Sequence, residues 1–172
     1  RGIASAPDFI TLDSADGGTG AAPQSLMDNL GLTVWESLPT VDKKLRDAGL
    51  RDRIKLIASG KMVNPSGVAA ALCLGADSVN TARGFMFALG CIQALQCNQN
   101  TCPTGITTHD PKLQKGLNPI SKADRVASYA RSIKKEVELI AHSAGVMEPH
   151  NLGREHAFII DAQGKPLPLL LH

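Results

Sequence analysis

Three of the four cysteines in this chain of 172 residues lie close together, at Cys91, Cys97 and Cys102. Their C-x5-C-x4-C spacing differs from the paired C-x2-C of structural zinc sites, and the chain has no C-x-x-C-H haem-attachment motif. Soft thiolates suit iron, and three of them on one loop can hold one face of an iron–sulfur cluster. The same spacing also allows three cysteines that bind no metal. The fourth, Cys73, falls in an apolar run and is predicted to lie in the core.

Composition narrows the class of protein. Apolar residues make up 43% of the chain and aromatic residues only 3%, which is typical of helices packed closely on a parallel sheet. The net charge of +2 with mixed signs gives no reason to expect a nucleic-acid partner. No run is long and apolar enough to span a bilayer, so no membrane contact is expected. Four cysteines without a secretory signal indicate a reducing compartment, which predicts a cytoplasmic protein.

Strands and helices are predicted to alternate along the chain. Apolar segments at 8–13, 54–58 and 77–81 read as strands. Helices are predicted at 23–30, 34–48, 66–74, 85–91 and 122–143. Such alternation predicts a parallel sheet with helical crossovers, either doubly wound or as part of a (β/α)8 barrel. No Gly-x-Gly-x-x-Gly motif opens a helix, which weakens the doubly wound alternative.

The segments that follow the strands could bind a phosphate. In barrels, phosphate groups commonly bind at the loops after the last two strands. Here the second and third strands are followed by small turns with the backbone amides of Gly60, Ala82 and Arg83. The guanidinium of Arg83 could add a charge-assisted contact, although a plain surface arginine is the alternative. Lys61 could also lie near such a ligand.

The first strand runs into a glycine-rich segment that contains Asp16, Gly17 and Gly18. Glycines at the end of a strand let the backbone approach a ligand closely, because no Cβ atom intervenes. A plain glycine-rich turn is the alternative interpretation.

Taken together, these motifs resemble the FMN-binding (synthase) domain of glutamate synthase, and in particular the shorter FMN-binding glutamate-synthase-like proteins. The matching segments occur in the family's order, at 16–23, 75–77, 90–91 and 100–105. The resemblance covers roughly residues 8–118, and the cysteine loop is its most specific part. It implies that the chain is α/β and forms the last three βα units of a TIM-like (β/α)8 barrel.

The resemblance also implies cofactors. It implies a [3Fe-4S] cluster on Cys91, Cys97 and Cys102, beside an FMN. It places Asp16, Gly17 and Gly18 in the flavin and substrate pocket. The candidate flavin-binding residues are therefore Asp16, Gly17, Gly18, Ser59, Gly60, Lys61, Ala82 and Arg83. No catalytic residue is assigned.

The activity implied by the resemblance is the reduction of 2-iminoglutarate, formed from 2-oxoglutarate and ammonia, to L-glutamate. Electrons would pass from the [3Fe-4S] cluster to FMN, and ferredoxin or an NAD(P)H-oxidising flavoprotein would supply them. One alternative is a related flavoprotein with another substrate, such as a methylamine-type glutamate synthase subunit. Another is a non-catalytic module that binds iron–sulfur or zinc.

Three positions depart from the family pattern. Ala15 stands where the family usually has histidine, Ser59 where it often has aspartate, and Val63 where it often has lysine or arginine. Backbone amides can hold a phosphate whatever the side chain, so the prediction of a phosphate site does not depend on these positions.

The expected organisation has two parts. Residues 1–147 are predicted to be the C-terminal part of the FMN-binding (β/α)8 domain, including the cysteine loop 91–105. Residues 148–172 are predicted to be an irregular extension with an edge strand at 158–161. The chain starts without Met and enters a strand almost at once, so we expect part of a longer protein. Exposed sheet edges would then pair with the remainder of the barrel or self-associate.

Two further expectations concern single residues. Arg51 and its two neighbours are predicted to form a solvated turn. The strand residues Phe9, Ile10, Leu56, Ile57 and Val79 are predicted to face an incomplete core.

Overall fold

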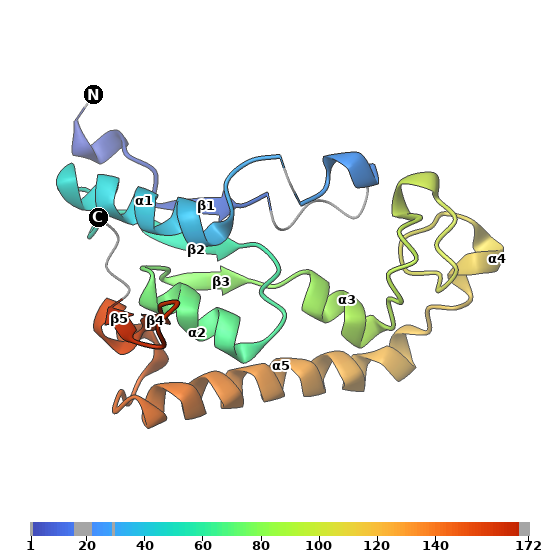
Figure 1. The fold of residues 1–172 in the computed structure, drawn as a ribbon. Coiled ribbons are helices and arrows are strands. Elements are labelled where there is room, and N and C mark those ends of the chain that lie inside the picture. The colour runs from blue at the N-terminus through green and yellow to red at the C-terminus, as the bar shows by residue number, and fades with distance from the viewer. Residues whose placement is uncertain (1, 16–21, 29, 169–172) are drawn as a thin grey trace.

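The computed structural model describes residues 2–15, 22–28 and 30–168 (Figure 1). Its centre is a parallel sheet in the order β1-β2-β3, with β1 at Phe9–Asp13, β2 at Lys55–Ser59 and β3 at Ser78–Asn80. Helix α1 (Val34–Asp47) connects the first two strands, and α2 (Pro65–Cys73) connects the second to the third. The predicted α/β class, with a parallel sheet and helical crossovers, is confirmed.

The chain continues through α3 (Arg83–Leu89), α4 (Pro111–Gln114) and the long α5 (Pro119–Ser143). Single 3-10 turns lie at Ile3–Ser5, Gln24–Leu26, Cys97–Gln99, Pro149–Asn151 and Arg154–His156. Strands β4 (Phe158–Ile160) and β5 (Pro166–Pro168) form an antiparallel hairpin. The helix predicted at 23–30 is wrong, because the described residues of this range, 23–28 and 30, form only the 3-10 turn. The helix predicted at 85–91 begins earlier and ends at Leu89, so Cys91 lies beyond it.

The strand register separates the two faces of the sheet. Ile10 lies beside Leu56, and Ala58 lies beside Val79, so these side chains share one face. Leu56 and Ala58 are fully buried there, against residues of both α1 and α2. The prediction that Ile10, Leu56 and Val79 face an incomplete core is therefore wrong, because the helices cover them.

The opposite face of the sheet is open. It carries Phe9, which is 59% exposed, together with the partly buried Ile57. Thr11 and Ser78 lie beside Ile57 on the same face. Within the described residues no helix packs against this face, and neither β1 nor β3 pairs with a further strand. Such a sheet, covered on one side only, is compatible with part of a barrel.

The amino ends of the strands are joined by a buried ion-pair network around Asp42. The Asp42 carboxylate, which is fully buried, accepts hydrogen bonds from Arg46 at 2.9 Å, Arg51 at 2.7 Å and Arg154 at 3.0 Å. Arg51 also donates to Asp77 at 2.8 Å. Its side chain is only 12% exposed, so the prediction of a solvated turn is wrong for Arg51.

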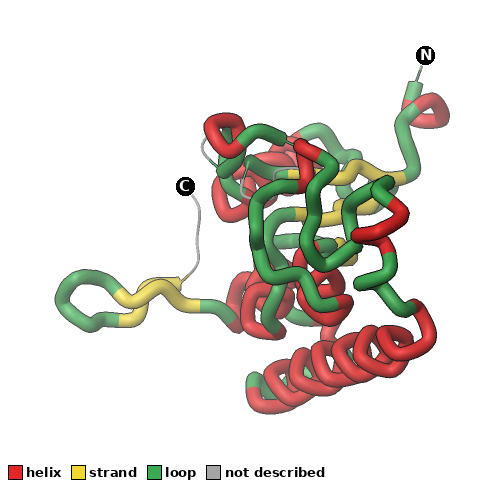
Figure 2. Tube along the Cα trace, turned by 90° about the vertical axis from the view of Figure 1, so that its right-hand side faces the viewer, coloured by secondary structure: helices red, strands yellow, loops and turns green. Residues whose placement is uncertain are grey.

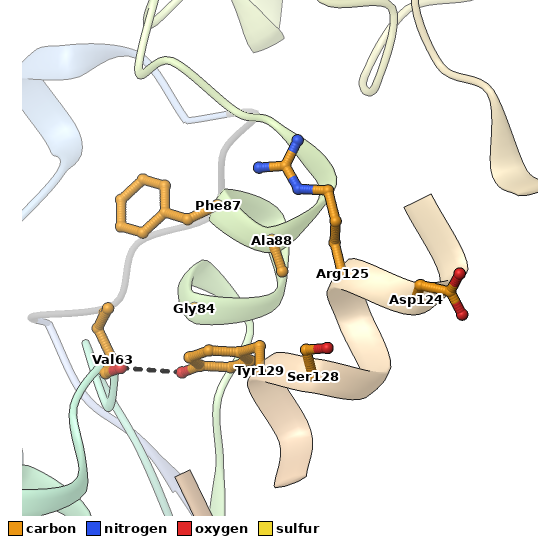
Figure 3. A pocket seen from close by; sticks show the side chains of 8 residues that line it. All are labelled: Val63, Gly84, Phe87, Ala88, Asp124, Arg125, Ser128 and Tyr129. Atoms are coloured by element: carbon orange, nitrogen blue, oxygen red, sulfur yellow. Dashed lines mark hydrogen bonds between the residues drawn. The ribbon is translucent and has the colours of Figure 1, made fainter. Parts of the chain in front are cut away.

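Helix α5 runs along α2 and α3 (Figure 1). At one end Cys73 packs with Ala69 and Ala141, which confirms Cys73 as a core residue. At the other end the Tyr129 hydroxyl donates to the Val63 carbonyl at 2.9 Å, as Figure 3 shows. A Cβ atom on Gly84 would overlap that hydroxyl, so glycine is needed for this close approach of α3 to α5.

No helix among residues 2–15, 22–28 and 30–168 has the length and apolarity needed to cross a membrane.

The Asp42 network gives a stability prediction. Asp42→Asn should lower the free energy of unfolding by about 3 kcal/mol, because the largely buried Arg51 would lose one of its ionised partners. Denaturant titration of the intact protein measures this. The control is Asp47→Asn, which removes the exposed pair with Lys43 and should cost under about 0.5 kcal/mol. Equal effects of the two changes would contradict the proposed importance of the network.

The same network predicts a pH dependence. Burial opposes ionisation of Asp42, but hydrogen bonds from Arg46 and Arg51 outweigh it and hold its pKa below the ordinary 3.8. The stabilisation is therefore present above pH 3.8 and is lost as the pH falls through the lower pKa of the folded state. Acidification should destabilise the wild type more than Asp42→Asn, measured as unfolding free energy against pH.

Candidate functional site

A cavity of about 900 Å³ lies between the carboxyl ends of the strands and the cysteine loop 91–105. Ligands of parallel α/β proteins commonly bind at this end of the sheet. Strand-end and loop residues that line it are Asp13, Ser59, Gly60, Lys61, Asn80, Ala82, Arg83, Cys91, Cys97 and Cys102. The fold thus brings the described candidate residues of both predicted sites, for the flavin and for the cluster, to one cavity.

The floor of the cavity carries a polar row formed by Asp13, Ser59 and Asn80. The strand register aligns these three residues, one from each strand, on the open face of the sheet. The Ser59 hydroxyl donates to the Asp13 carboxylate at 2.9 Å. Ser59 is among the residues predicted from the sequence, whereas Asp13 and Asn80 are not. Their signal was the position of a polar residue at the end of each apolar strand.

The turn after β2 is shaped by close packing. A Cβ atom on Gly60 would overlap the Ser14 hydroxyl, so Gly60 is required here by the neighbouring strand end, whatever it binds. A Gly60→Val change would therefore disturb the turn itself. A loss of flavin affinity in this variant would not show that the Gly60 backbone contacts the phosphate. The ammonium of Lys61 pairs with Asp28 at 2.9 Å. This pair directs the Lys61 charge toward the segment before α1.

The turn after β3 leads directly into α3. Ala82 and Arg83 line the cavity at the start of this helix, and Met86 and Phe87 line it one turn later. The backbone at the start of α3 and an apolar wall thus lie next to each other in the cavity. The candidates Asp16, Gly17 and Gly18 lie outside the described residues.

The cysteine loop has an unusual backbone. Gln93, Leu95 and Asn100 have positive φ angles of 54°, 56° and 62°. These are left-handed conformations that cost energy for residues other than glycine, asparagine and aspartate. The surrounding structure holds the loop, since the Thr108 hydroxyl donates to the Asn100 carbonyl at 2.6 Å. The His109 amide donates to the Asn100 side chain at 2.6 Å, while His109 itself is exposed.

All three loop cysteines line the cavity. Cys102 is buried, and Cys91 and Cys97 are partly buried. In the described part of the chain, no three His, Cys, Asp or Glu side chains converge on one point as ligands of a single metal ion would. An iron–sulfur cluster needs thiolates distributed around a larger body, with each bound to a different iron. Three thiols that line one cavity are the type of ligand that iron–sulfur clusters use.

Cys102 has the environment of a ligand. Burial raises the pKa of its thiol, but hydrogen bonding outweighs this and brings the pKa to about 6. The Thr104 hydroxyl lies 3.3 Å from the sulfur, and Thr107 also favours the thiolate. In contrast, burial and the charge of Glu155 raise the pKa of Cys73. Because the thiolate is the form that binds metal, Cys102 is better suited than Cys73 to be a metal ligand.

The structure is that of an α/β protein with a cavity at the carboxyl ends of a parallel sheet. Residues 2–147 match the family model described as the conserved region in glutamate synthase, so the chain belongs to the glutamate synthase family.

Curated relatives agree with this membership. The chain is 49% identical over 150 residues to the glutamate synthase large subunit-like protein YerD of Bacillus subtilis, covering 87% of this chain and 29% of that protein. It is 37% identical over 139 residues to the archaeal-type glutamate synthase [NADPH] of Dehalococcoides mccartyi, covering 81% and 28%. A glutamate synthase large subunit-like protein of Rhizobium meliloti is 30% identical over 164 residues, with 86% and 37% covered. The chain therefore spans well under half the length of these relatives.

Proposed function

We propose that this chain is part of an iron–sulfur flavoprotein that reduces 2-iminoglutarate, formed from 2-oxoglutarate and ammonia, to L-glutamate. The observation that carries the proposal is the single cavity lined both by the turns after β2 and β3 and by three cysteines. Membership of the glutamate synthase family, and the relatives named glutamate synthase [NADPH], support the choice of reaction.

In this proposal the chain holds two cofactors. Cys91, Cys97 and Cys102 bind a [3Fe-4S] cluster, and the backbone amides of Gly60, Ala82 and Arg83 hold the FMN phosphate. When both are bound, the cluster would pass on electrons one at a time. FMN would collect two of them and supply a hydride to the imine carbon. Ferredoxin or an NAD(P)H-oxidising flavoprotein supplies the electrons, and the protein works in the cytoplasm.

The chain's own groups would position these cofactors and the substrate. Met86, Phe87 and Ile106 offer the apolar surface that a planar ring system needs, and Arg83 offers a positive charge to a phosphate. The polar row of Asp13, Ser59 and Asn80 adds hydrogen-bonding groups at the floor. Asp16, Gly17 and Gly18 would complete the pocket. Lys61 is a weaker candidate because Asp28 already neutralises its charge.

The proposed architecture is the last three βα units of a TIM-like (β/α)8 barrel. Residues 1–147 form this part of the domain, and residues 148–172 form a C-terminal extension. The open sheet face supports the barrel, because a barrel's inner face meets other strands and not helices. Phe9 and Ile57, together with the edges of β1 and β3, would be covered by the remaining strands of the longer protein, or by self-association in their absence.

An activity assay of the intact protein separates the proposal from two alternatives. The proposal predicts that the protein forms L-glutamate when it is supplied with 2-oxoglutarate, ammonia and either reduced ferredoxin or the flavoprotein donor. Preferential use of methylamine would support the methylamine-type glutamate synthase. Absence of bound flavin from protein that contains iron or zinc would support a non-catalytic module.

The cluster can be tested by cysteine substitution. Cys91→Ser, Cys97→Ser and Cys102→Ser should each remove most of the iron, labile sulfide and visible cluster absorption from anaerobically prepared intact protein, because serine oxygen is a harder ligand than thiolate. Cys73→Ser is the matched control and should keep all three signals, since Cys73 lies in the core. Wild-type iron content in the loop variants would contradict the assignment.

The flavin site can be tested at Arg83. Arg83→Gln should weaken FMN binding at least about tenfold, the effect of losing a hydrogen bond between charged groups, of roughly 1.5 kcal/mol. Fluorescence titration of flavin-depleted intact protein measures the affinity. Arg125→Gln is the control, because Arg125 lies on α5 against a separate cavity (Figure 3) and should leave affinity unchanged. Equal affinities of wild type and Arg83→Gln would place the phosphate elsewhere.

A further inference from the structure

The C-terminal hairpin of β4 and β5 projects from the body of the protein (Figure 2). Phe158, Ile159 and Ile160 are 59%, 53% and 62% exposed, so both faces of β4 are apolar and open to solvent. A two-stranded hairpin alone is at best marginally stable in water. These consecutive apolar side chains therefore indicate that another surface covers the hairpin.

The register shows which edge of the hairpin can accept another strand. The amide of Asp161 donates to the carbonyl of Lys165 at 3.0 Å. In an antiparallel ladder, hydrogen-bonded and non-hydrogen-bonded pairs alternate, so Ile159 and Leu167 form the next hydrogen-bonded pair. The backbone N–H and C=O groups of Phe158 and Ile160 must then point away from β5.

The other edge of the hairpin is blocked. By the same alternation, the backbone nitrogens of Pro166 and Pro168 point away from β4, and a proline nitrogen has no hydrogen to donate. Proline on an edge strand is a common protection against pairing. Over its described length, the hairpin thus has one edge that can accept a strand and one that cannot.

We propose that β4 pairs in antiparallel fashion with β4 of a second copy of this chain, about a two-fold axis at Ile159. Phe158 of one copy then lies opposite Ile160 of the other, and both residues satisfy their outward N–H and C=O groups. The two hairpins form one continuous sheet whose outer edges are the proline-blocked β5 strands. Because neither outer edge accepts a further strand, assembly ends at the dimer.

Charge favours a second copy as the occupant. The edge itself carries no charged side chain, so two identical edges meet without repulsion. The exposed Glu155 precedes β4, and the exposed Lys165 follows the turn at its other end. An antiparallel arrangement places Glu155 of one copy at the end of the sheet where Lys165 of the other copy lies. The edge is short, so the interface is small and the dimer should dissociate on dilution.

A charge-swap experiment on the intact protein tests this pairing. The double variant Phe158→Lys/Ile160→Lys should be monomeric, because each lysine would face a lysine of the other copy. The double variant Phe158→Lys/Ile160→Glu should dimerise, because each lysine would face a glutamate. All of these side chains are largely exposed, so both variants should fold. Analytical ultracentrifugation over a range of concentrations measures the result, and circular dichroism checks folding.

The outcomes separate this surface from other contacts. A monomeric wild type at all concentrations would overturn the proposal and would indicate that another segment of the same polypeptide covers β4. Equal dimerisation of wild type and the Lys/Lys variant would also overturn it, because the dimer would then form elsewhere, for example through the edges of β1 and β3. We expect the Phe158→Lys/Ile160→Lys variant to lose the dimer and the Phe158→Lys/Ile160→Glu variant to recover it.

Discussion

The alternation of side chains along parallel, aligned strands is the constraint on which the site depends. Each residue that faces the helices is followed by one that faces the open side, so apolar and ligand-facing roles must alternate. Leu56 and Ala58 fix β2 against α1 and α2. Ser59 is thereby aligned with Asp13 and Asn80 at the floor of the cavity. A shift of one residue in this register would bury the polar row and expose the core.

The two ends of the sheet are stabilised in different ways. At the amino ends, Asp42 binds Arg46, Arg51 and Arg154, and the last of these comes from the segment just before the hairpin. Removing the Asp42 carboxylate would leave the guanidinium of Arg51, which is only 12% exposed, without one of its ionised partners. At the carboxyl ends the backbone is held more by turns and close glycine contacts. The buried ion-pair network and the candidate ligand cavity therefore lie at opposite ends of the strands.

Sequence patterns predicted the features that depend on local order. Apolar alternation located the three parallel strands, and the cysteine spacing together with the family motifs located the loop that lines the cavity. The burial of Arg51 could not be predicted, because its partners Asp42 and Asp77 lie 9 and 26 residues away and meet it only in the folded chain. Asp13 and Asn80 were missed for the same reason, since only the register makes them neighbours of Ser59. The hairpin edge likewise depends on which residues of β5 lie opposite β4.

The cysteine loop links backbone cost to the type of metal group proposed for it. A short loop could bring three thiols to one point only by curling tightly, as C-x2-C turns do at zinc sites. Here the wider spacing and the left-handed Gln93, Leu95 and Asn100 distribute the cysteines around a cavity wall. The hydrogen bond from the Thr108 hydroxyl to the Asn100 carbonyl ties this backbone to the rest of the loop. Three cysteines on the wall of one cavity are the ligand set that the proposed iron–sulfur cluster requires.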